Sequence, residues 1–489
     1  MLEIYSEGYQ TIPGYELYMI GFHDLRAGFD FILDYGIPKF VYSAISAVAV
    51  HLPPDVVGAL LTMPNIKYIE KDALAYVLGF PQYPDMQYMS RVSVLAQTPS
   101  WGYSKIKAGE VHASGNRGTG IRVCVIDSGV DPAHEDLVAN LKGGYNFVNN
   151  TPTLKDDCGH GTHVCGIVAA VDNGIGVLGV APEVSLFACR GLSNIKGSCS
   201  GSYTDLNASI QWAIDNKMHV INMSWGGELY SQTMNDLLKA AYNSGIVPVA
   251  SAGNSGKSAP DTCGYPAKYN PVIAVAATDK DDLSASFSSQ GLAVEVAAPG
   301  VKILSTVPKD CSMYCDPSGY AVFGGTSMAS PHVAGLAALI LKAHPSFTVD
   351  QVRGALNAGV SDLGDPGRDP VFGFGRIDAP KAISITSPPP PPPPMSAKQC
   401  QKHGREPPTC DVMDVKGFNE CDTYCDCPYK TRWICGIRPD APLRCGLGKD
   451  TYCIPKGYDS LAECSDCCKA GTCKPGACAP LGCSINMDG

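Results

Sequence analysis

The chain has 489 residues, of which 45% are hydrophobic, and a formal net charge of −10. This length allows two or three domains, since a domain usually holds about 100–200 residues, and the apolar fraction allows a sizeable core. The negative charge argues against nucleic acid or an anionic membrane as partner. The most apolar early stretch, residues 41–63, is interrupted by His51, Pro53, Pro54 and Asp55, so we expect no membrane span.

Residues 1–78 alternate short β-like runs with amphipathic stretches and contain no cysteine. We expect strands at residues 15–22, 47–51 and 68–76, and a short helix at 53–63 with proline near its start. The pattern predicts a small α+β unit. Residues 79–95 show no clear periodicity and are expected to form an exposed connector. The start has neither the basic residues nor the apolar run of a signal peptide; we favour a truncated start over a different export route.

Residues 96–384 have the pattern of an α/β domain. Apolar, β-branched runs at 121–126, 220–224, 246–250 and 272–276 are typical of buried parallel strands. Helical patterns lie between them, most clearly at 203–216 and 233–244. This alternation predicts a parallel sheet with helices on both faces. The functional site of such a sheet lies at the carboxyl ends of its strands.

The end of the chain differs from the rest in composition. Residues 385–394 contain seven consecutive prolines, which predict either a stiff polyproline II spacer or a ligand for a proline-binding domain; we favour the spacer. Of 22 cysteines, fourteen lie between Cys400 and Cys483. This density predicts a separate disulfide-rich domain at 395–489 and an oxidising compartment. Zinc is the alternative, but the segment has a single histidine, His403, and no repeated paired CxxC units.

Three glycine-rich segments carry residues of possible catalytic value. Asp127 ends an apolar run, His160 stands between two glycines, and Ser327 follows Gly324-Gly325-Thr326 at the start of an apolar helix. Each residue alone is better explained as a cap or a turn. Together they supply a nucleophile, a base and a group that orients the base, in the chain order Asp, His, Ser that is known for subtilisin.

The segment from Ala96 to about Ile383 resembles the subtilisin family, including its proteinase K-like members. Gly176-Val-Leu-Gly-Val-Ala-Pro182, Val220-Ile-Asn-Met-Ser-Trp-Gly-Gly227, Ser251-Ala-Gly-Asn254 and Gly325-Thr-Ser-Met-Ala-Ser-Pro-His-Val333 look like family signatures. The resemblance implies a serine endopeptidase that works through an acyl-enzyme. An inactive homologue that acts as a binding or adhesion protein is the alternative; the triad and Asn254 argue against it.

The resemblance also implies individual roles. His160 takes the proton of Ser327, Asp127 holds the other imidazole nitrogen, and the Asn254 amide helps to bind the oxyanion. His163 and His332 are interpreted as structural. The substrate is expected to lie as an extended strand, with a large apolar residue before the scissile bond. Trp225 replaces a usual aliphatic residue, and it either narrows a pocket or packs on the surface. The expected substrate-binding residues are Ser200, Gly201, Ser202, Ser224, Trp225, Gly226, Gly253 and Gly264.

A calcium loop is also implied by the resemblance. Oxygen ligands suit a hard cation of structural, not catalytic, function. A second, weaker site at Glu295 is a further possibility, and a plain Gly/Asn turn is the alternative for the first. The implied ligands are the side chains of Gln97, Asp136 and Asn173 and the carbonyls of Val171, Ile175 and Val177.

Residues 1–78 resemble the inhibitory propeptide of subtilases, notably at 15–22 and at Tyr68-Ile-Glu-Lys-Asp72; an unrelated β-rich domain is the alternative. The resemblance implies a zymogen that cleaves itself near residues 76–79 and again just before Ala96. We further expect a monomeric, secreted enzyme that acts on proteins and peptides. Among the other cysteines, Cys124, Cys165 and Cys189 are expected to be free, whereas Cys311 and Cys315 are plausible partners.

Overall fold

The computed structural model describes residues 12–77, 96–387, 434–436 and 452–454. The chain divides into two compact units, Met1–Pro392 and Pro393–Gly489. In the second unit, β19 (Ile434–Gly436) and β20 (Tyr452–Ile454) pair antiparallel. The predicted connector, most of the proline-rich linker and the cysteine framework of the tail lie outside the described residues. Within the described residues, no helix is both long and apolar enough to cross a membrane.

The N-terminal part of the first unit is a four-stranded antiparallel sheet in the order β2-β3-β1-β4. Its core includes Ile20, Phe22, Ile32, Val50 and Leu60, all at most 1% exposed. The elements are β1 (Glu16–Phe22), α1 (Leu25–Leu33), β2 (Ile37–Tyr42), β3 (Ala47–Leu52), the 3₁₀ helix η1 (Pro54–Val56), α2 (Val57–Leu60), β4 (Ile66–Lys71) and β5 (Leu74–Tyr76).

Two predictions for this part need correction. Residues 53–63 do not form one helix, because a 3₁₀ turn with Pro54 at its start precedes a single α-helical turn. Residues 68–76 are not one strand either. The chain leaves the first sheet after Lys71, and β5 joins a different sheet, of order β5-β10-β9, with β9 (Ser193–Ile195) and β10 (Ser198–Ser202).

A nine-stranded sheet forms the centre of the remaining part, in the order β17-β18-β14-β13-β12-β11-β6-β8-β7. All neighbouring strands are parallel except β17 and β18. The apolar runs therefore form the predicted buried strands. Its strands are β6 (Arg122–Asp127), β7 (Leu141–Asn146), β8 (Ser185–Arg190), β11 (Val220–Met223), β12 (Val247–Ser251), β13 (Ile273–Thr278), β14 (Val294–Pro299), β17 (Val360–Ser361) and β18 (Arg376–Ile377).

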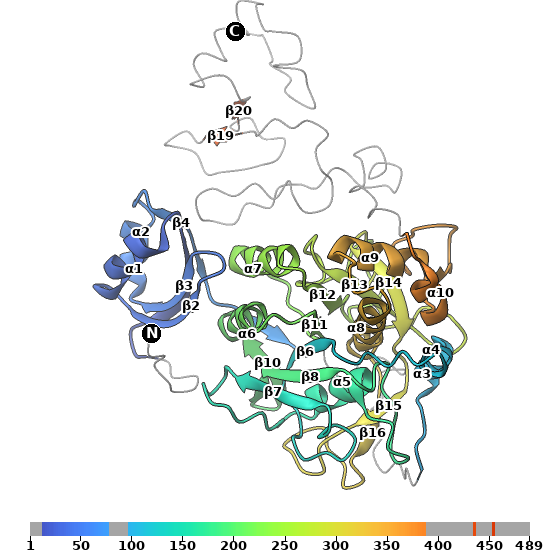
Figure 1. Cartoon of the computed structure of the whole chain (residues 1–489). Helices are drawn as coiled ribbons and strands as arrows, with labels where there is room; N and C mark the ends of the chain where they lie inside the picture. The colour runs from blue at the N-terminus through green and yellow to red at the C-terminus, as the bar shows by residue number, and fades with distance from the viewer. Residues whose placement is uncertain (1–11, 78–95, 388–433, 437–451, 455–489) are drawn as a thin grey trace, which may run out of the picture. The chain divides into compact units, whose positions relative to one another are not determined.

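Helices cover both faces of this sheet, with α6 and α7 on one side and α5 and α8 on the other (Figure 1). All residues of α5 are buried, which suits its apolar sequence. The α/β prediction is confirmed. The helices are α3 (Trp101–Lys105), α4 (Ala108–Ala113), α5 (His160–Ala169), α6 (Tyr203–Asp215), α7 (Gln232–Asn243), α8 (Thr326–Ala343), α9 (Val349–Ala358) and α10 (Ala379–Ser384), and β15 (Ile303–Thr306) and β16 (Tyr320–Phe323) form a separate hairpin.

Candidate active site

An aspartate and a histidine meet at the carboxyl end of the sheet, where β6 ends at Asp127 and α5 begins at His160. His160 Nδ1 lies 2.8 Å from Asp127 Oδ1, and the same oxygen accepts the N–H of Ser128 at 2.8 Å. Both side chains are buried. His160 Nε2 is also buried and has no hydrogen-bond partner within the described residues. With Nδ1 held by the carboxylate, Nε2 is the nitrogen that can accept a proton.

The turn before His160 is organised by one fully buried carboxylate, Asp156. Its bonds satisfy backbone donors at the start of α5, which have no partner within the helix. Burial raises the pKa of Asp156, and the hydrogen bonds oppose that shift. The carboxylate accepts the N–H groups of Cys158, Gly159 and Thr162 and the hydroxyls of Ser128 and Thr162, at distances from 2.7 to 3.0 Å.

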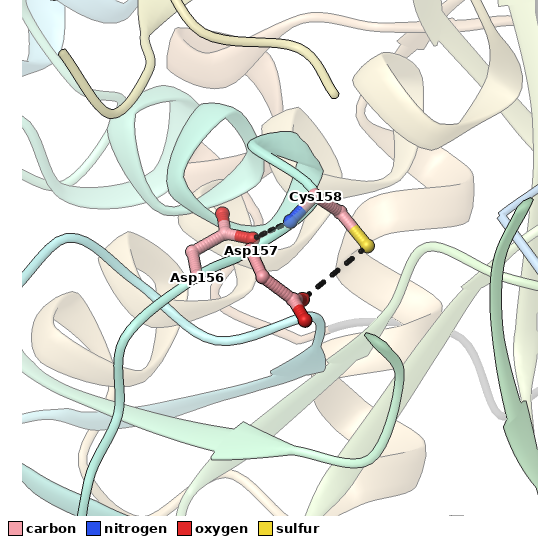
Figure 2. A group of neighbouring side chains, drawn as sticks. All are labelled: Asp156, Asp157 and Cys158. Carbon is pink, nitrogen blue, oxygen red and sulfur yellow. Dashed lines mark hydrogen bonds between the residues drawn. The ribbon is translucent and has the colours of Figure 1, made fainter. Parts of the chain in front are cut away.

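Asp156, Asp157 and Cys158 lie close enough together to suggest a metal site (Figure 2). Cys158, however, forms a disulfide with Cys199, so its sulfur is not available as the thiolate that a metal would need. Arg190 Nη2 lies 2.6 Å from Asp157 Oδ2. Each group already has a structural partner, and we assign no metal to this cluster. The disulfide instead ties the start of α5 to β10.

Ser327 is the second residue of α8 and is 2% exposed. Its hydroxyl donates to the carbonyl of Ser224 at 3.0 Å, and the Ser224 hydroxyl donates to the carbonyl of Ser327 at 2.9 Å. The second bond compensates for Pro331, which lacks the N–H that would otherwise bond the carbonyl four residues earlier. Within the described residues, no hydrogen bond joins Ser327 Oγ to His160 Nε2. A bond between these two atoms would require the serine side chain to turn away from Ser224.

Asn254 is held at the start of the same helix. Its Oδ1 accepts the N–H of Thr326 at 2.9 Å and the Thr326 hydroxyl at 2.8 Å. With the amide oxygen occupied in this way, the Nδ2 donor lies beside Gly325, where an added Cβ would stand 3.3 Å from it. The Asn254 amide donor is thus held beside Gly325, two residues before Ser327 in the chain.

β5 of the N-terminal part lies as a middle strand between two segments of residues 96–387, which are called the catalytic part below. On one edge it pairs with β10; on the other, Tyr76 and Gly226 exchange backbone hydrogen bonds of 2.9 and 3.0 Å. Gly201 is required in β10, because a Cβ there would lie 1.9 Å from the carbonyl oxygen of Gly191. In the pairing with β10, Leu74, Ala75 and Tyr76 stand opposite Ser202, Gly201 and Ser200.

Gly253, Gly264 and Trp225 complete the set of expected substrate-binding residues. Gly264 donates its N–H to the carbonyl of Ala252 at 3.1 Å, which places it beside Gly253. Trp225 is fully buried, and its Nε1 donates to the carbonyl of Ile126 at 2.9 Å. The indole therefore fastens this segment to β6, and the interpretation of Trp225 as surface packing is wrong.

The residues expected to bind calcium form one connected network, which contains only oxygen atoms as potential ligands. Gln97 Nε2 lies 2.8 Å from the carbonyl of Val171 and 3.2 Å from that of Val177, so a turn of the amide would direct its oxygen to the same place. The remaining bonds are Asn173 Nδ2 to Asp136 Oδ1 at 2.9 Å, the Val177 N–H to Asp136 Oδ2 at 2.8 Å, and the Ile175 N–H to Asn173 Oδ1 at 3.1 Å.

The idea of a second calcium site at Glu295 is wrong. Glu295 is 2% exposed and lies 2.5 Å from Arg353 Nη2, while its other oxygen accepts from Asn357 at 2.8 Å. Burial raises the pKa of Glu295, but the charges of Arg353 and Arg368 and the hydrogen bonds from Arg353 and Asn357 together outweigh burial, so the pKa is lowered. Both carboxylate oxygens already serve a buried ion pair.

Two further histidines have structural partners, as expected. His163 Nε2 lies 3.1 Å from the carbonyl of Ile303, and its ring stacks on Phe323. Burial lowers the pKa of His163 to about 3 and that of His332 to about 4, so both remain neutral.

The cysteines agree only partly with expectation. Cys124, Cys165 and Cys189 are free and buried. Cys311 and Cys315 are neighbours, with the Cys311 N–H 3.0 Å from the Cys315 sulfur, but they are not joined. Among the described residues Cys158 and Cys199 form a disulfide that was not expected from the sequence.

The profile of the Subtilase family matches residues 118–375. The chain belongs to the subtilase family. It is 42% identical over 326 residues to subtilisin E of Bacillus subtilis (strain 168), covering 66% of this chain and 78% of the relative. It is 48% identical over 271 residues to subtilisin DY of Bacillus licheniformis, covering 55% and 94%. For M-protease of Shouchella clausii (strain KSM-K16) the values are 38% over 341 residues, 70% and 80%.

These matches confirm the predicted family and make this subtilase a serine-type endopeptidase that acts on protein substrates.

Two interactions that hold the candidate site in place were not predicted from the sequence. Asp156 stands four residues before His160, where an acidic cap was a signal that could have been used. Pro331 inside α8 signals an unsatisfied carbonyl at Ser327, but not that Ser224 supplies the bond.

Proposed function

We propose that Asp127, His160 and Ser327 cleave the peptide bond through an acyl-enzyme. His160 Nε2 removes the proton from Ser327 Oγ as this oxygen attacks the carbonyl carbon. Asp127 fixes the tautomer of His160 and stabilises the imidazolium that forms. The imidazolium then protonates the departing amine, and a water molecule, activated by the same nitrogen, releases the acyl group.

Asn254 is proposed to bind the oxyanion of the tetrahedral intermediate, together with the backbone N–H of Ser327. Its amide oxygen is occupied by Thr326, so the side chain needs no reorientation when negative charge develops. Removal of one such donor lowers kcat by about 10²–10³, a value measured on subtilisin itself.

One observation carries the mechanism: Asp127 bonds Nδ1 of His160 at 2.8 Å and leaves Nε2 buried without a partner among the described residues. The test is hydrolysis of casein by the wild-type protein and by Ser327→Ala, with a serine-directed inhibitor as control. We expect the variant and the inhibited enzyme to be inactive. Activity that survives Ser327→Ala would overturn the mechanism.

We further propose that residues 1–78 are an inhibitory propeptide. Support comes from β5, which occupies the position of an extended substrate between β10 and the segment at Gly226. Active protein should therefore lack this segment, and the second cut is proposed before Ala96. N-terminal sequencing of active enzyme tests this, since retention of residue 1 would contradict it.

The register of β5 suggests the first cleavage position. Tyr76 stands opposite Gly226 in an antiparallel bridge, and Ser224 lies two residues before Gly226 on the facing segment. The carbonyl of Ser224 receives the Ser327 hydroxyl at 3.0 Å. Cleavage is therefore proposed between Leu78 and Gly79, which lie outside the described residues. A leucine at this position agrees with the proposed preference for a large apolar side chain before the scissile bond.

Calcium is proposed to bind at Gln97, Asp136 and Asn173 and at the carbonyls of Val171, Ile175 and Val177. The oxygen-only donor set fits a hard cation, whose contribution would be stability alone. A chelator should lower the midpoint of thermal unfolding, and added calcium should restore it. A midpoint indifferent to chelation would contradict the site.

Secretion and a monomeric state complete the proposal. The Cys158–Cys199 disulfide and the cysteine density of residues 395–489 support an oxidising compartment. For residues 395–489 we propose a role in targeting, substrate binding or protection. Their positive and negative charges balance and favour no class of ligand.

A further inference from the structure

A buried ion pair joins the N-terminal part to the catalytic part at the start of α6. Lys39 belongs to β2, and Asp205 lies in the first turn of α6. Lys39 Nζ lies 2.7 Å from Asp205 Oδ1; the lysine side chain is 16% exposed and the aspartate 0%. The second oxygen, Oδ2, is buried and has no hydrogen-bond partner among the described residues. Lys39 is thus the cation that compensates this carboxylate.

The surrounding contacts show that the N-terminal part itself buries Asp205. The Tyr42 hydroxyl donates to the carbonyl of Thr204 at 3.0 Å, and the Ala44 N–H donates to Gln211 Oε1 at 3.0 Å. These contacts lie on both sides of Asp205 along α6. Removal of residues 12–77 would return the carboxylate to water.

A second carboxylate makes the need for a cation greater. Asp72 Oδ1 accepts the N–H and the hydroxyl of Thr204 at 2.9 and 3.0 Å, next to Asp205. Burial and the negative charge of Asp205 raise the pKa of Asp72 to about 7, whereas Lys39 opposes this shift. Lys39 is therefore the positive charge that balances one fully buried carboxylate, Asp205, and one partly buried carboxylate, Asp72, at this interface.

These observations give Asp205 a selective role. An ion pair that forms in a buried interface costs desolvation on both sides and adds little net affinity, but loss of one partner leaves a buried charge and is strongly unfavourable. In the released enzyme, water solvates Asp205, so its charge carries no desolvation penalty. It becomes costly only when a segment without a cation covers α6, so it acts against the wrong partner.

We propose that Asp205 is a recognition element that admits an inhibitory domain with a cation at the place of Lys39 and rejects one without it. The inference rests on the proposed inhibitory role of residues 1–78. The partner is this chain's own N-terminal domain, and the chemical feature that Asp205 recognises is a primary ammonium group.

The test uses the full-length protein after self-cleavage, with residues 1–78 still bound. Activity against a short peptide is measured as the sample is diluted, and the midpoint of its appearance reports the dissociation of the domain. Lys39→Met should shift this midpoint to concentrations on the order of 100-fold higher. The released enzyme is chemically identical to wild type, because Lys39 leaves with the domain.

Three controls make the result specific. Lys71→Met removes an exposed ion pair with Glu16, 61% and 37% exposed, in the same domain, and should leave the midpoint unchanged. Asp205→Asn in the Lys39→Met background should recover most of the lost affinity, because the buried charge is gone. Thermal unfolding of the same variants with Ser327→Ala shows whether each still folds.

Two results would overturn the proposal: a midpoint within about twofold of wild type in folded Lys39→Met, or effects of Lys39→Met and Asp205→Asn that simply add. Full activity at every dilution of the wild-type protein would instead contradict the inhibitory role itself. The two failures are therefore distinguishable.

Discussion

Carboxylates bind the N-termini of α5, α6 and α7, but they come from different parts of the chain. α5 is capped by Asp156, which belongs to the catalytic part and lies four residues before His160. α6 and α7 receive Asp72 and Glu70 from the N-terminal part. Both of those helices also have a cap of their own, Ser202 and Ser231.

Asp156 therefore stays at α5 in any form of the protein, whereas Asp72 and Glu70 would leave together with the N-terminal part. α5 positions His160, and without Asp156 the N–H groups of Cys158, Gly159 and Thr162 would lose their acceptor. α6 and α7 keep their serine caps and can meet water when the N-terminal part leaves. The same interaction, a carboxylate at the positive end of a helix, thus stabilises the candidate site in one place and the proposed inhibited complex in the other.

The largest expected effect follows from Asp156→Ala, because it removes a fully buried acceptor of five hydrogen bonds. We expect a loss of more than about 4 kcal/mol in the free energy of unfolding, together with loss of activity. Urea unfolding in the Ser327→Ala background measures it. Asp172→Ala, which removes an exposed pair with Arg117, should cost less than about 1 kcal/mol. Equal losses in the two variants would contradict the role of the cap.

The Cys158–Cys199 disulfide joins the segment that precedes His160 to β10, the strand that pairs with β5. Replacement of Cys158 and Cys199 by serine opens a link between positions 41 residues apart and should cost about 2–4 kcal/mol of unfolding free energy. At low temperature the variant remains folded, so its catalytic rate should be affected less than its free energy of unfolding. A variant as stable as wild type would show that the bridge does not constrain the chain.

Glu70→Ala should act on the inhibited complex alone. Glu70 accepts the Ser231 hydroxyl at 2.7 Å and the N–H groups of Gln232 and Thr233 at 2.8 and 3.0 Å. Its loss should weaken the complex by about 2 kcal/mol, or roughly 30-fold in dissociation constant. Dilution of the self-cleaved protein measures this, and stability of the released enzyme should not change. A lower unfolding midpoint of that enzyme would argue against a removable cap.

The smallest effect is a dependence of the complex on pH. Asp72 has an ordinary pKa of 3.8, which burial raises to about 7 in the complex. A raised pKa means that the complex holds the proton more tightly, so this stabilisation is complete below about pH 4 and is lost as pH rises through about 7. Burial raises the pKa of Glu70 and Asp205 in the same direction, while Lys39 opposes the shift of Asp205.

The dissociation constant should therefore increase on the order of tenfold between pH 5.5 and 7.5. Samples are diluted at each pH and assayed briefly at one fixed pH, so that titration of the catalytic site does not interfere. Asp72→Asn should reduce the slope. A slope of opposite sign would contradict the assignment.

The sequence predicted those features that depend on local pattern. The β6 run and the glycines around His160 and Ser327 indicated the candidate triad residues, because strand ends and helix starts are visible in apolar periodicity. Contacts between distant segments were not visible in this way. Nothing local pairs Cys158 with Cys199, links Asp72 to Thr204, or places Arg353 against Glu295, because these contacts depend on how the sheet and helices pack.

The break between β4 and β5 has the same origin. Residues 68–76 have the composition of one strand, but Asp72 turns toward α6, and only the partner surface determines where the first sheet ends. Local propensity can define a strand, whereas its partner sets its length.

The bond between Ser224 and the Ser327 carbonyl has a consequence for variation among relatives. Pro331 leaves one carbonyl of α8 without its helical donor, and the Ser224 hydroxyl fills that place at 2.9 Å. A chain with an ordinary residue at position 331 would regain the N–H and no longer need a hydroxyl at position 224. Substitutions at positions 224 and 331 should therefore be accepted in pairs more readily than singly.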